Sequence, residues 1–323
     1  MQDLVTLEPS VFEAPTQVLC NLCHENRAKV FCTKTVNGFS TEFTFVQCEG
    51  CGLVFLNPRP SLASLDQLYN SKEYFQGKDK AIGYFDYLSE ESFRRQTAAA
   101  KIKEIERALG RKGRLLEIGC AAGFFLAAAR DAGWEVSGLD ISEPMIQYAR
   151  ESYKLDAWIM RFEDLDLATH LTARQGSYDV IACWGTTGTF LDPVGNFLKV
   201  HNLLKDDGLF VFNASDSDSL LANLMGSRWY CLQPSAAHAY NRRVLLKMLS
   251  QTGFDLVRLQ TDRHHITLYK VMTQRQVARG RFVEWIASLV RELPLAHKPF
   301  LFPNLGFIEC YARKSRVQGG NTS

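Results

Sequence analysis

Short apolar runs alternate with segments of helical periodicity from residue 114 onward. Continuous apolar runs are typical of strands that are buried on both faces of a parallel sheet, and helical spacing marks the helices between them. Alternation of this kind predicts a doubly wound α/β fold. We expect core strands at 115–118, 134–140, 157–160, 178–183, 209–213, 254–259 and 306–313.

The chain before this core has two other patterns. Residues 1–60 are rich in β-forming residues in alternation, whereas residues 61–112 have helical spacing, with Ser61 as the expected N-cap. In the helix expected at 96–109, Lys101 is among the charged residues that we expect to point outward.

The last two core strands are separated by a segment that is too long for a hairpin loop. It contains an amphipathic pattern near 274–292, so we interpret it as an insertion. The expected units are a zinc ribbon at 1–60, a helical connector or lid at 61–112, a core at 113–262 and 304–316, and the insertion at 263–303.

The turn after the first core strand carries the most specific chemistry. Gly119 and Gly123 let the backbone approach a ligand, and Asp140, about 20 positions further on, is placed to accept hydrogen bonds from a ribose diol. A dinucleotide site would have a third glycine where Phe124 stands, and Glu117 would repel a pyrophosphate. A ligand with an ammonium group and no phosphate suits this turn. The alternatives are a strand-turn-helix without a ligand and a helix-capping role for Asp140.

From residue 115 to residue 140 the sequence resembles the class I S-adenosylmethionine-dependent methyltransferases, whose first motif is apolar-apolar-Glu/Asp-x-Gly-x-Gly-x-Gly. Ala121 replaces the middle glycine, which adds one methyl group. The resemblance implies a Rossmann-like sheet of seven strands in the order 3-2-1-4-5-7-6 and S-adenosylmethionine as the cofactor. It implies cofactor contacts from Glu117, Gly119, Cys120, Ala121, Gly123, Phe124, Asp140, Ile141, Met145, Phe162, Glu163, Cys183 and Trp184.

The end of the fourth core strand bears on the methyl acceptor. Enzymes that methylate amines of nucleic acids usually carry Asn/Asp-Pro-Pro-Tyr/Phe here, but residues 183–186 read Cys-Trp-Gly-Thr. This difference argues against methylation of an exocyclic amine. Many relatives also have Glu-His-Leu where residues 188–190 read Gly-Thr-Phe, so a base has to come from elsewhere.

Methyl transfer to a hydroxyl requires aligned reactants and removal of a proton. The family often has Arg-Trp and then a His in the segment that corresponds to 214–240, so His238 is the expected catalytic base. A structural capping histidine is the alternative. The expected substrate-side residues are Tyr74, Arg228, Trp229, Tyr240 and His264.

Four of the nine cysteines form two Cys-x-x-Cys pairs, Cys20 with Cys23 and Cys48 with Cys51. Four thiolates on two such turns make a closed tetrahedral zinc site, which is structural because it leaves no open position. A unit of about 60 residues buries little core, so zinc would supply folding energy. The alternative is four unrelated buried cysteines.

Composition and charge indicate where the protein acts and which classes of partner it has. The chain is 46% hydrophobic and 22% charged, as soluble globular proteins are, and it has no apolar run of about 18 residues, so we expect no membrane span. The first 15 residues contain no basic residue, which is unlike a secretory signal and leads us to expect a cytoplasmic protein.

These observations predict methyl transfer to a hydroxyl of a small-molecule, sugar, lipid-linked or natural-product acceptor. Residues 1–60 have four basic and six acidic residues, a balance of −2, so we do not expect nucleic acid as a partner. Residues 263–323 have ten basic and three acidic residues, a balance of +7, which supports the alternative of a zinc-ribbon RNA methyltransferase. A non-catalytic cofactor-binding scaffold is the third hypothesis, and the presence of Glu117 and Asp140 disfavours it.

Overall fold

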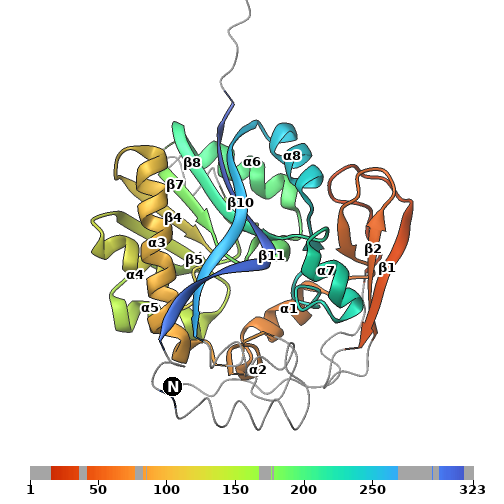
Figure 1. Cartoon of the computed structure of the whole chain (residues 1–323), viewed down its shortest axis with the longest axis horizontal. Coiled ribbons are helices and arrows are strands. Elements are labelled where there is room, and N and C mark those ends of the chain that lie inside the picture. The colour runs from red at the N-terminus through yellow and green to blue at the C-terminus, as the bar shows by residue number, and fades with distance from the viewer. Residues whose placement is uncertain are drawn as a thin grey trace, which may run out of the picture.

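The computed structural model describes residues 16–35, 42–76, 83–84, 86–166, 176, 178–267, 293 and 298–315. These residues form a seven-stranded sheet with helices on both faces and a four-stranded sheet beside it (Figure 1). The fold class expected from the sequence is therefore confirmed.

The larger sheet has the order β10-β11-β8-β7-β4-β5-β6. The five strands from β8 to β6 in this order are parallel, and β11 lies antiparallel between β10 and β8. Read from β6 and counted along the chain, this is 3-2-1-4-5-7-6, the order that the resemblance implies. The strands are β4 (Arg114–Ile118), β5 (Glu135–Asp140), β6 (Ala157–Ile159), β7 (Tyr178–Cys183), β8 (Leu204–Ser215), β10 (Phe254–Thr267) and β11 (Pro299–Lys314).

Helices cover both faces of this sheet because side chains alternate along its strands. Leu115 of β4 joins the buried cluster formed with α3, α4 and α5, whereas Leu116 joins the cluster formed with α6 and α8 on the other face. The helices are α3 (Glu91–Leu109), α4 (Phe124–Asp131), α5 (Glu143–Tyr153), α6 (Pro193–Leu203) and α8 (Arg242–Gln251).

The smaller sheet, which we call the ribbon sheet, combines two distant parts of the chain. It has the antiparallel order β1 (Ala28–Thr35), β2 (Glu42–Cys48), β3 (Val54–Leu56) and β9 (His238–Ala239). All three residues of β3 are buried, so its outer edge requires a partner, and β9 supplies it. The zinc ribbon expected at 1–60 is therefore incomplete without a strand that follows β8.

The connector lies against the turn that follows β4. It contains α1 (Leu62–Tyr69), α2 (Lys72–Gln76) and the 3₁₀ turn η2 (Leu88–Glu90), and the Ser61 hydroxyl caps α1 as expected, accepting from Ser64 N at 3.2 Å. Phe75 of α2 and Tyr87 pack in one buried cluster with residues of that turn.

The last two strands form a hairpin that is longer than the sequence predicts (Figure 1). Residues 263–267 pair with 299–303, so the two strands extend five residues into each end of the expected insertion, 263–303. Apolar and polar residues alternate only weakly in these two stretches, so the sequence pattern did not reveal that they are strands held by backbone pairing. The helix expected near 274–292 lies outside the described residues.

Two further segments connect the sheets. The 3₁₀ turn η3 (Thr187–Thr189) follows β7, and α7 (Leu220–Met225) with η4 (Gly226–Arg228) precedes β9. Among the helices that the structure describes, none has the length and apolar character needed to cross a bilayer.

Candidate functional site

The turn after β4 lies at the carboxyl end of the parallel strands, where α/β sheets bind ligands. Gly119 has a φ of +75° and Gly123 a φ of +77°, a region that favours glycine. A Cβ on Gly119 would lie 2.1 Å from Thr186 Oγ1, and one on Gly123 would lie 2.4 Å from the Leu155 side chain. Backbone conformation and close packing therefore both require glycine at these two positions.

Ala121, which replaces the middle glycine of the family motif, has a backbone conformation that favours glycine. Its φ is +44°, which costs a residue with a Cβ about 1 kcal/mol. Its N–H donates to Asp140 Oδ2 at 2.9 Å, and the N–H of Cys120 donates to Leu139 O at 3.1 Å. The turn is thus fixed to β5 in a strained conformation, as residues at ligand sites often are.

Glu117 is the penultimate residue of β4, and its carboxylate is buried. The residue is 4% exposed, and its Oε2 has no hydrogen-bond partner among the described residues. Burial, together with the charge of Asp140, raises its pKa well above the usual value. An unpaired buried carboxylate is costly, so a ligand that brings an ammonium group would stabilise it.

Asp140 is held by the backbone on both sides. Besides the bond from Ala121 N, its Oδ1 accepts from Ser142 N at 2.8 Å, and burial raises its pKa. Each oxygen keeps a lone pair, so the carboxylate can still accept from a diol. Ser142 occupies the N-cap position of α5 without a side-chain capping bond, and Ile141 beside it is half-buried.

Aromatic side chains of the connector cover this turn. Phe75, Tyr87, Phe124 and Met145 belong to one buried cluster, and the rings of Tyr87 and Phe124 stack with centroids 5.4 Å apart. Tyr74 is half-buried and meets Phe75 edge-on at 4.9 Å. The structure thus brings the expected residues Phe124, Met145 and Tyr74 together at the turn.

Phe162 and Glu163 lie against protein. Phe162 is 3% exposed and stacks with Phe190 at 6.2 Å, while Glu163 Oε1 accepts from Leu191 N at 3.1 Å and from Asn196 Nδ2 at 2.7 Å. These contacts give both side chains a packing role without a ligand, and their expected adenine contacts stay predictions.

The loop after β7 faces the glycine turn. Cys183 is fully buried, and Trp184 is partly buried with no hydrogen-bond partner for Nε1 among the described residues. The N–H of Gly185 donates to Asn213 Oδ1 at 2.6 Å, and Thr186 contacts Gly119. The expected residues Cys183 and Trp184 therefore adjoin the turn.

His238 lies in β9 of the ribbon sheet, and Tyr240 follows it next to η3. His238 is 1% exposed, and its Nε2 is 3.2 Å from Asn21 Oδ1. Burial, assisted by the charge of Arg59, lowers its pKa to about 3. Tyr240 OH donates to the carbonyl of Thr187 at 2.9 Å. These contacts favour a positioning role for His238, and its role as a base stays a prediction.

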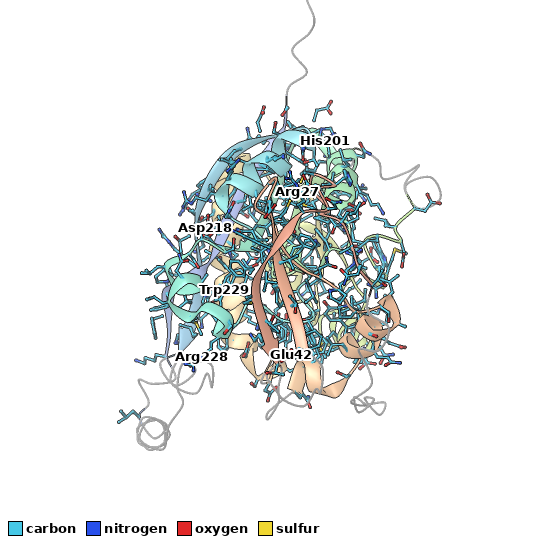
Figure 2. The ribbon with its side chains drawn as sticks, turned by 90° about the vertical axis from the view of Figure 1, so that its right-hand side faces the viewer. Arg27, Glu42, His201, Asp218, Arg228 and Trp229 are labelled. Atoms are coloured by element: carbon cyan, nitrogen blue, oxygen red, sulfur yellow. The ribbon has the colours of Figure 1, made fainter. Side chains whose placement is uncertain are left out.

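Arg228 and Trp229 lie in different environments. Arg228 is exposed, whereas Trp229 is fully buried in the cluster that contains Phe45 and Leu56 of the ribbon sheet. Figure 2 shows Trp229 beside the ribbon strands and Arg228 nearer the outer edge. The Trp229 side chain packs against apolar residues, while its Nε1 has no hydrogen-bond partner among the described residues, so the expected substrate contact stays a prediction.

A buried ionic network that no sequence pattern predicted lies on the α3 side of the sheet. Lys101, expected to point outward, is 8% exposed, and its Nζ lies 2.6 Å from Asp262 Oδ1 and 2.7 Å from Glu309 Oε2. Burial alone would lower the pKa of Lys101, but the two carboxylates raise it above the usual value. Lys101 lies between Ala98 and Ile105 on the buried face of α3. This spacing indicates a buried position, but a lysine is ordinarily expected at the surface.

The four cysteines of the two Cys-x-x-Cys pairs form one cluster, with every sulfur within 4.8 Å of the others. The Sγ atoms of Cys20 and Cys51 are 3.5 Å apart, as are those of Cys23 and Cys48. Ligands of a tetrahedral zinc ion at about 2.3 Å are about 3.8 Å apart, so four thiolates here fit a structural zinc ion.

The sequence matches the family described as "Methyltransferase domain" over residues 91–259. It is 29% identical to the putative methyltransferase YqeM of Bacillus subtilis over 36% of this chain and 47% of that protein, so the match spans about half of the relative. It is 25% identical to the ubiquinone biosynthesis O-methyltransferase of Leptothrix cholodnii over 57% of this chain and 83% of that protein.

Among solved structures, a methyltransferase of Thermotoga maritima described as a possible histamine N-methyltransferase superposes with a TM-score of 0.46 and 16% identity, covering 71% of this chain and 93% of that one. The family match extends over more than half of the chain and includes the glycine turn, Asp140 and the loop after β7. The chain belongs to the S-adenosylmethionine-dependent methyltransferases.

Proposed function

We propose that this enzyme transfers the methyl group of S-adenosylmethionine to a hydroxyl of a small-molecule, sugar or natural-product acceptor. The observation that carries this proposal is the loop after β7. Its Cys-Trp-Gly-Thr sequence lacks the side chain and carbonyls that hold a planar amine in amino-methylating enzymes. The name of the Leptothrix relative, an O-methyltransferase, gives further support.

The glycine turn would hold the cofactor. Glu117 Oε2 has no partner among the described residues and suits the ammonium of the methionine part, while Asp140 suits the ribose diol. Gly119, Cys120, Ala121 and Gly123 would supply the close backbone approach, and Met145 and Phe124 the apolar wall. S-adenosylmethionine supplies an electrophilic methyl group, and the chain aligns it with the acceptor and excludes water.

The four-cysteine cluster would hold a structural zinc ion. The segment between its first two ligands bonds directly to the loop region after β7, since Asn21 Nδ2 donates to the carbonyl of Leu191 at 3.1 Å. Arg59 donates to the same carbonyl at 2.9 Å. The ribbon would therefore support the acceptor side of the site.

An acceptor assay tests this proposal. S-adenosylmethionine labelled in the methyl group is incubated with the enzyme and catechol, methyl α-glucoside or a nucleotide-linked hexose, and labelled methyl ethers are identified by mass spectrometry. We expect an ether from at least one probe and none from Asp140→Ala, which should lose cofactor binding in calorimetry. Methylation of amines only would refute the hydroxyl assignment.

Filter binding with bulk RNA over a salt series addresses the zinc-ribbon RNA methyltransferase. Phosphate recognition makes affinity fall steeply as salt rises. We expect no such salt-dependent affinity, because the ribbon is net acidic. Tight, salt-sensitive binding accompanied by methylated RNA would favour the alternative.

A further inference from the structure

A continuous path of contacts leads from the loop after β7 to the interface of α3 with β10. Lys101 Nζ lies 4.0 Å from the ring centroid of Trp184, and the same ammonium group bonds to Asp262 on β10. Asn213, which holds Gly185, also donates to Asp262 Oδ2 at 3.0 Å. The loop next to the cofactor turn is thus tied to this buried network.

The path returns to the same loop through His264. His264 stands two residues after Asp262 on β10 and is half-buried, whereas Arg263 between them is exposed. The charges of Asp262, Lys101, Arg94 and Glu90 act on its imidazole, so His264 lies near this network. The Arg94 guanidinium lies 5.0 Å from the ring centroid of Tyr84.

Tyr84 connects Arg94 to the loop after β7 through its hydroxyl. This hydroxyl is 4.0 Å from the position that a Cβ on Gly185 would occupy. Trp184, Lys101, Asp262, His264, Arg94, Tyr84 and Gly185 therefore lie near one another around the loop after β7, and we call this group the ring.

Two polar atoms in this ring have unmet hydrogen-bonding capacity. Trp184 Nε1 and His264 Nδ1 are both buried and have no hydrogen-bond partner among the residues that the structure describes. Nδ1 of His265 and several atoms elsewhere share this property, but Trp184 Nε1 and His264 Nδ1 both lie next to the loop after β7. Leaving such atoms unpaired is costly, so a polar ligand that bonds to both would stabilise this group.

The charges of the ring favour an uncharged ligand. Lys101 is paired with Asp262 and Glu309, and Arg94 is paired with Glu90 at 2.5 Å, so two cations face three carboxylates, a balance of −1. An anionic acceptor would meet no free cation among these residues. A neutral hydroxyl could donate to an imidazole nitrogen and accept from the Trp184 indole.

We propose that His264 is the catalytic base and that the acceptor is a neutral, hydroxyl-bearing molecule bound between His264 and Trp184. This inference rests on the proposed function and names its base. The acceptor oxygen attacks the methyl carbon, the carbon–sulfur bond breaks, and its electron pair stays on sulfur. The hydroxyl proton passes to His264, so one positive charge leaves the sulfonium and one appears on the imidazolium. Asp262 and Glu90 stabilise that imidazolium.

The local electrostatics agree with this role. Burial lowers the pKa of His264, although Asp262 raises it in part, so the ring is neutral and able to accept a proton near neutral pH. Lys101, with Asp262 and Glu309, is a positioning group that holds Trp184 at the ring.

The test compares His264→Ala with the matched control His265→Ala on the same strand. His265 is the adjacent residue, and no acidic group among the described residues shifts the pKa of its imidazole. With catechol and methyl α-glucoside as hydroxyl probes, we expect His264→Ala to lower kcat by about 100-fold or more while cofactor affinity in calorimetry is unchanged. Added imidazole should restore part of the rate, and His265→Ala should stay within about threefold of wild type.

Each possible result either supports or overturns the assignment of His264 as the base. A structural defect would weaken cofactor binding and would not respond to imidazole, and His264→Asn, which keeps a polar side chain, checks the fold independently. Wild-type turnover in His264→Ala, or a loss that imidazole does not restore, would overturn the base assignment while the methyl-transfer function stands. No turnover of either probe by a wild-type enzyme that binds S-adenosylmethionine would overturn this inference together with the hydroxyl-acceptor function.

Discussion

At the scale of single residues, the site is defined by polar groups that the fold leaves without protein partners. Glu117 Oε2, Trp184 Nε1 and His264 Nδ1 are all buried and lack partners among the described residues. Interior polar groups are usually paired because desolvation is costly. In the proposed function, Glu117 would bond to the methyl donor, and Trp184 and His264 would bond to the acceptor.

Glu117→Gln tests the ammonium contact. The amide should weaken S-adenosylmethionine binding by about 10- to 100-fold, because a charged hydrogen bond is worth about 1.5–3 kcal/mol. The cofactor-free variant should be more stable than wild type at neutral pH, because it buries no unpaired charge. Calorimetry and thermal unfolding measure the two effects.

Both the stability of the folded protein and its affinity for the cofactor should depend on pH through Glu117. The pKa of Glu117 is raised above 4.5 in the folded protein, so its contribution to stability is fully present below about pH 4.5 and is lost as pH rises through the raised value. Cofactor binding needs the carboxylate, so affinity should increase over the same window. An affinity that is independent of pH, or equal in Glu117→Gln, would contradict the ammonium contact.

The proximity of candidate site residues could be predicted where chemistry and spacing agree. Glu117, Gly119, Gly123 and Asp140 meet at one turn, as their spacing indicates. Lys101 could not be found in this way, because a lysine on an amphipathic helix ordinarily faces water and its partners lie on strands far along the chain. The surroundings of His238 were equally hidden, since they depend on Asn21 of the ribbon.

At the scale of elements, the ribbon and the loop region after β7 form one bonded unit. Asn21 is the link, because its amide nitrogen donates to Leu191 O and its oxygen lies 3.2 Å from His238 Nε2. Glu163 fixes the other side of Leu191 by accepting from its N–H at 3.1 Å. A movement of the ribbon would therefore be transmitted to the acceptor side of the site.

Asn21→Ala should lower methyl transfer by several-fold and leave cofactor affinity within about twofold. The physical reason is that the loop loses a hydrogen bond, worth about 1 kcal/mol, while the glycine turn keeps its contacts. Asn26→Ala, at an exposed position of the same ribbon, is the matched control. Equal kinetics in the two variants would show that the ribbon does not position the loop.

At the scale of the whole molecule, the zinc cluster and the core sheet share one interior. Cys20, Cys48 and Cys51 belong to the same buried cluster as Phe190 and Phe212. The sequence predicted the sheet because its strands carry a local signal, but it assigned the ribbon to residues 1–60, since a pairing between β3 and β9 leaves no local pattern. Long-range pairing of short strands is the part of the fold that periodicity cannot reveal.

Removal of zinc should destabilise the whole chain in a single step. Because the cysteines and the core share a cluster, chelation by EDTA should lower the midpoint of one cooperative thermal transition by several degrees or more. Differential scanning calorimetry with and without chelator measures this, and zinc analysis gives the metal content. Two separate transitions, with the second insensitive to chelation, would indicate an independent ribbon.

The two-residue strand β9 also limits how this protein could have been assembled from parts. Because β9 completes the ribbon sheet at β3, the zinc unit is not a cassette that recombination could attach to any catalytic core. A transplanted ribbon would need the segment after β8 to travel with it, or its edge would be left open to pairing with other chains. During synthesis, too, the sheet of β1, β2 and β3 can be completed only after His238 and Ala239 have been made.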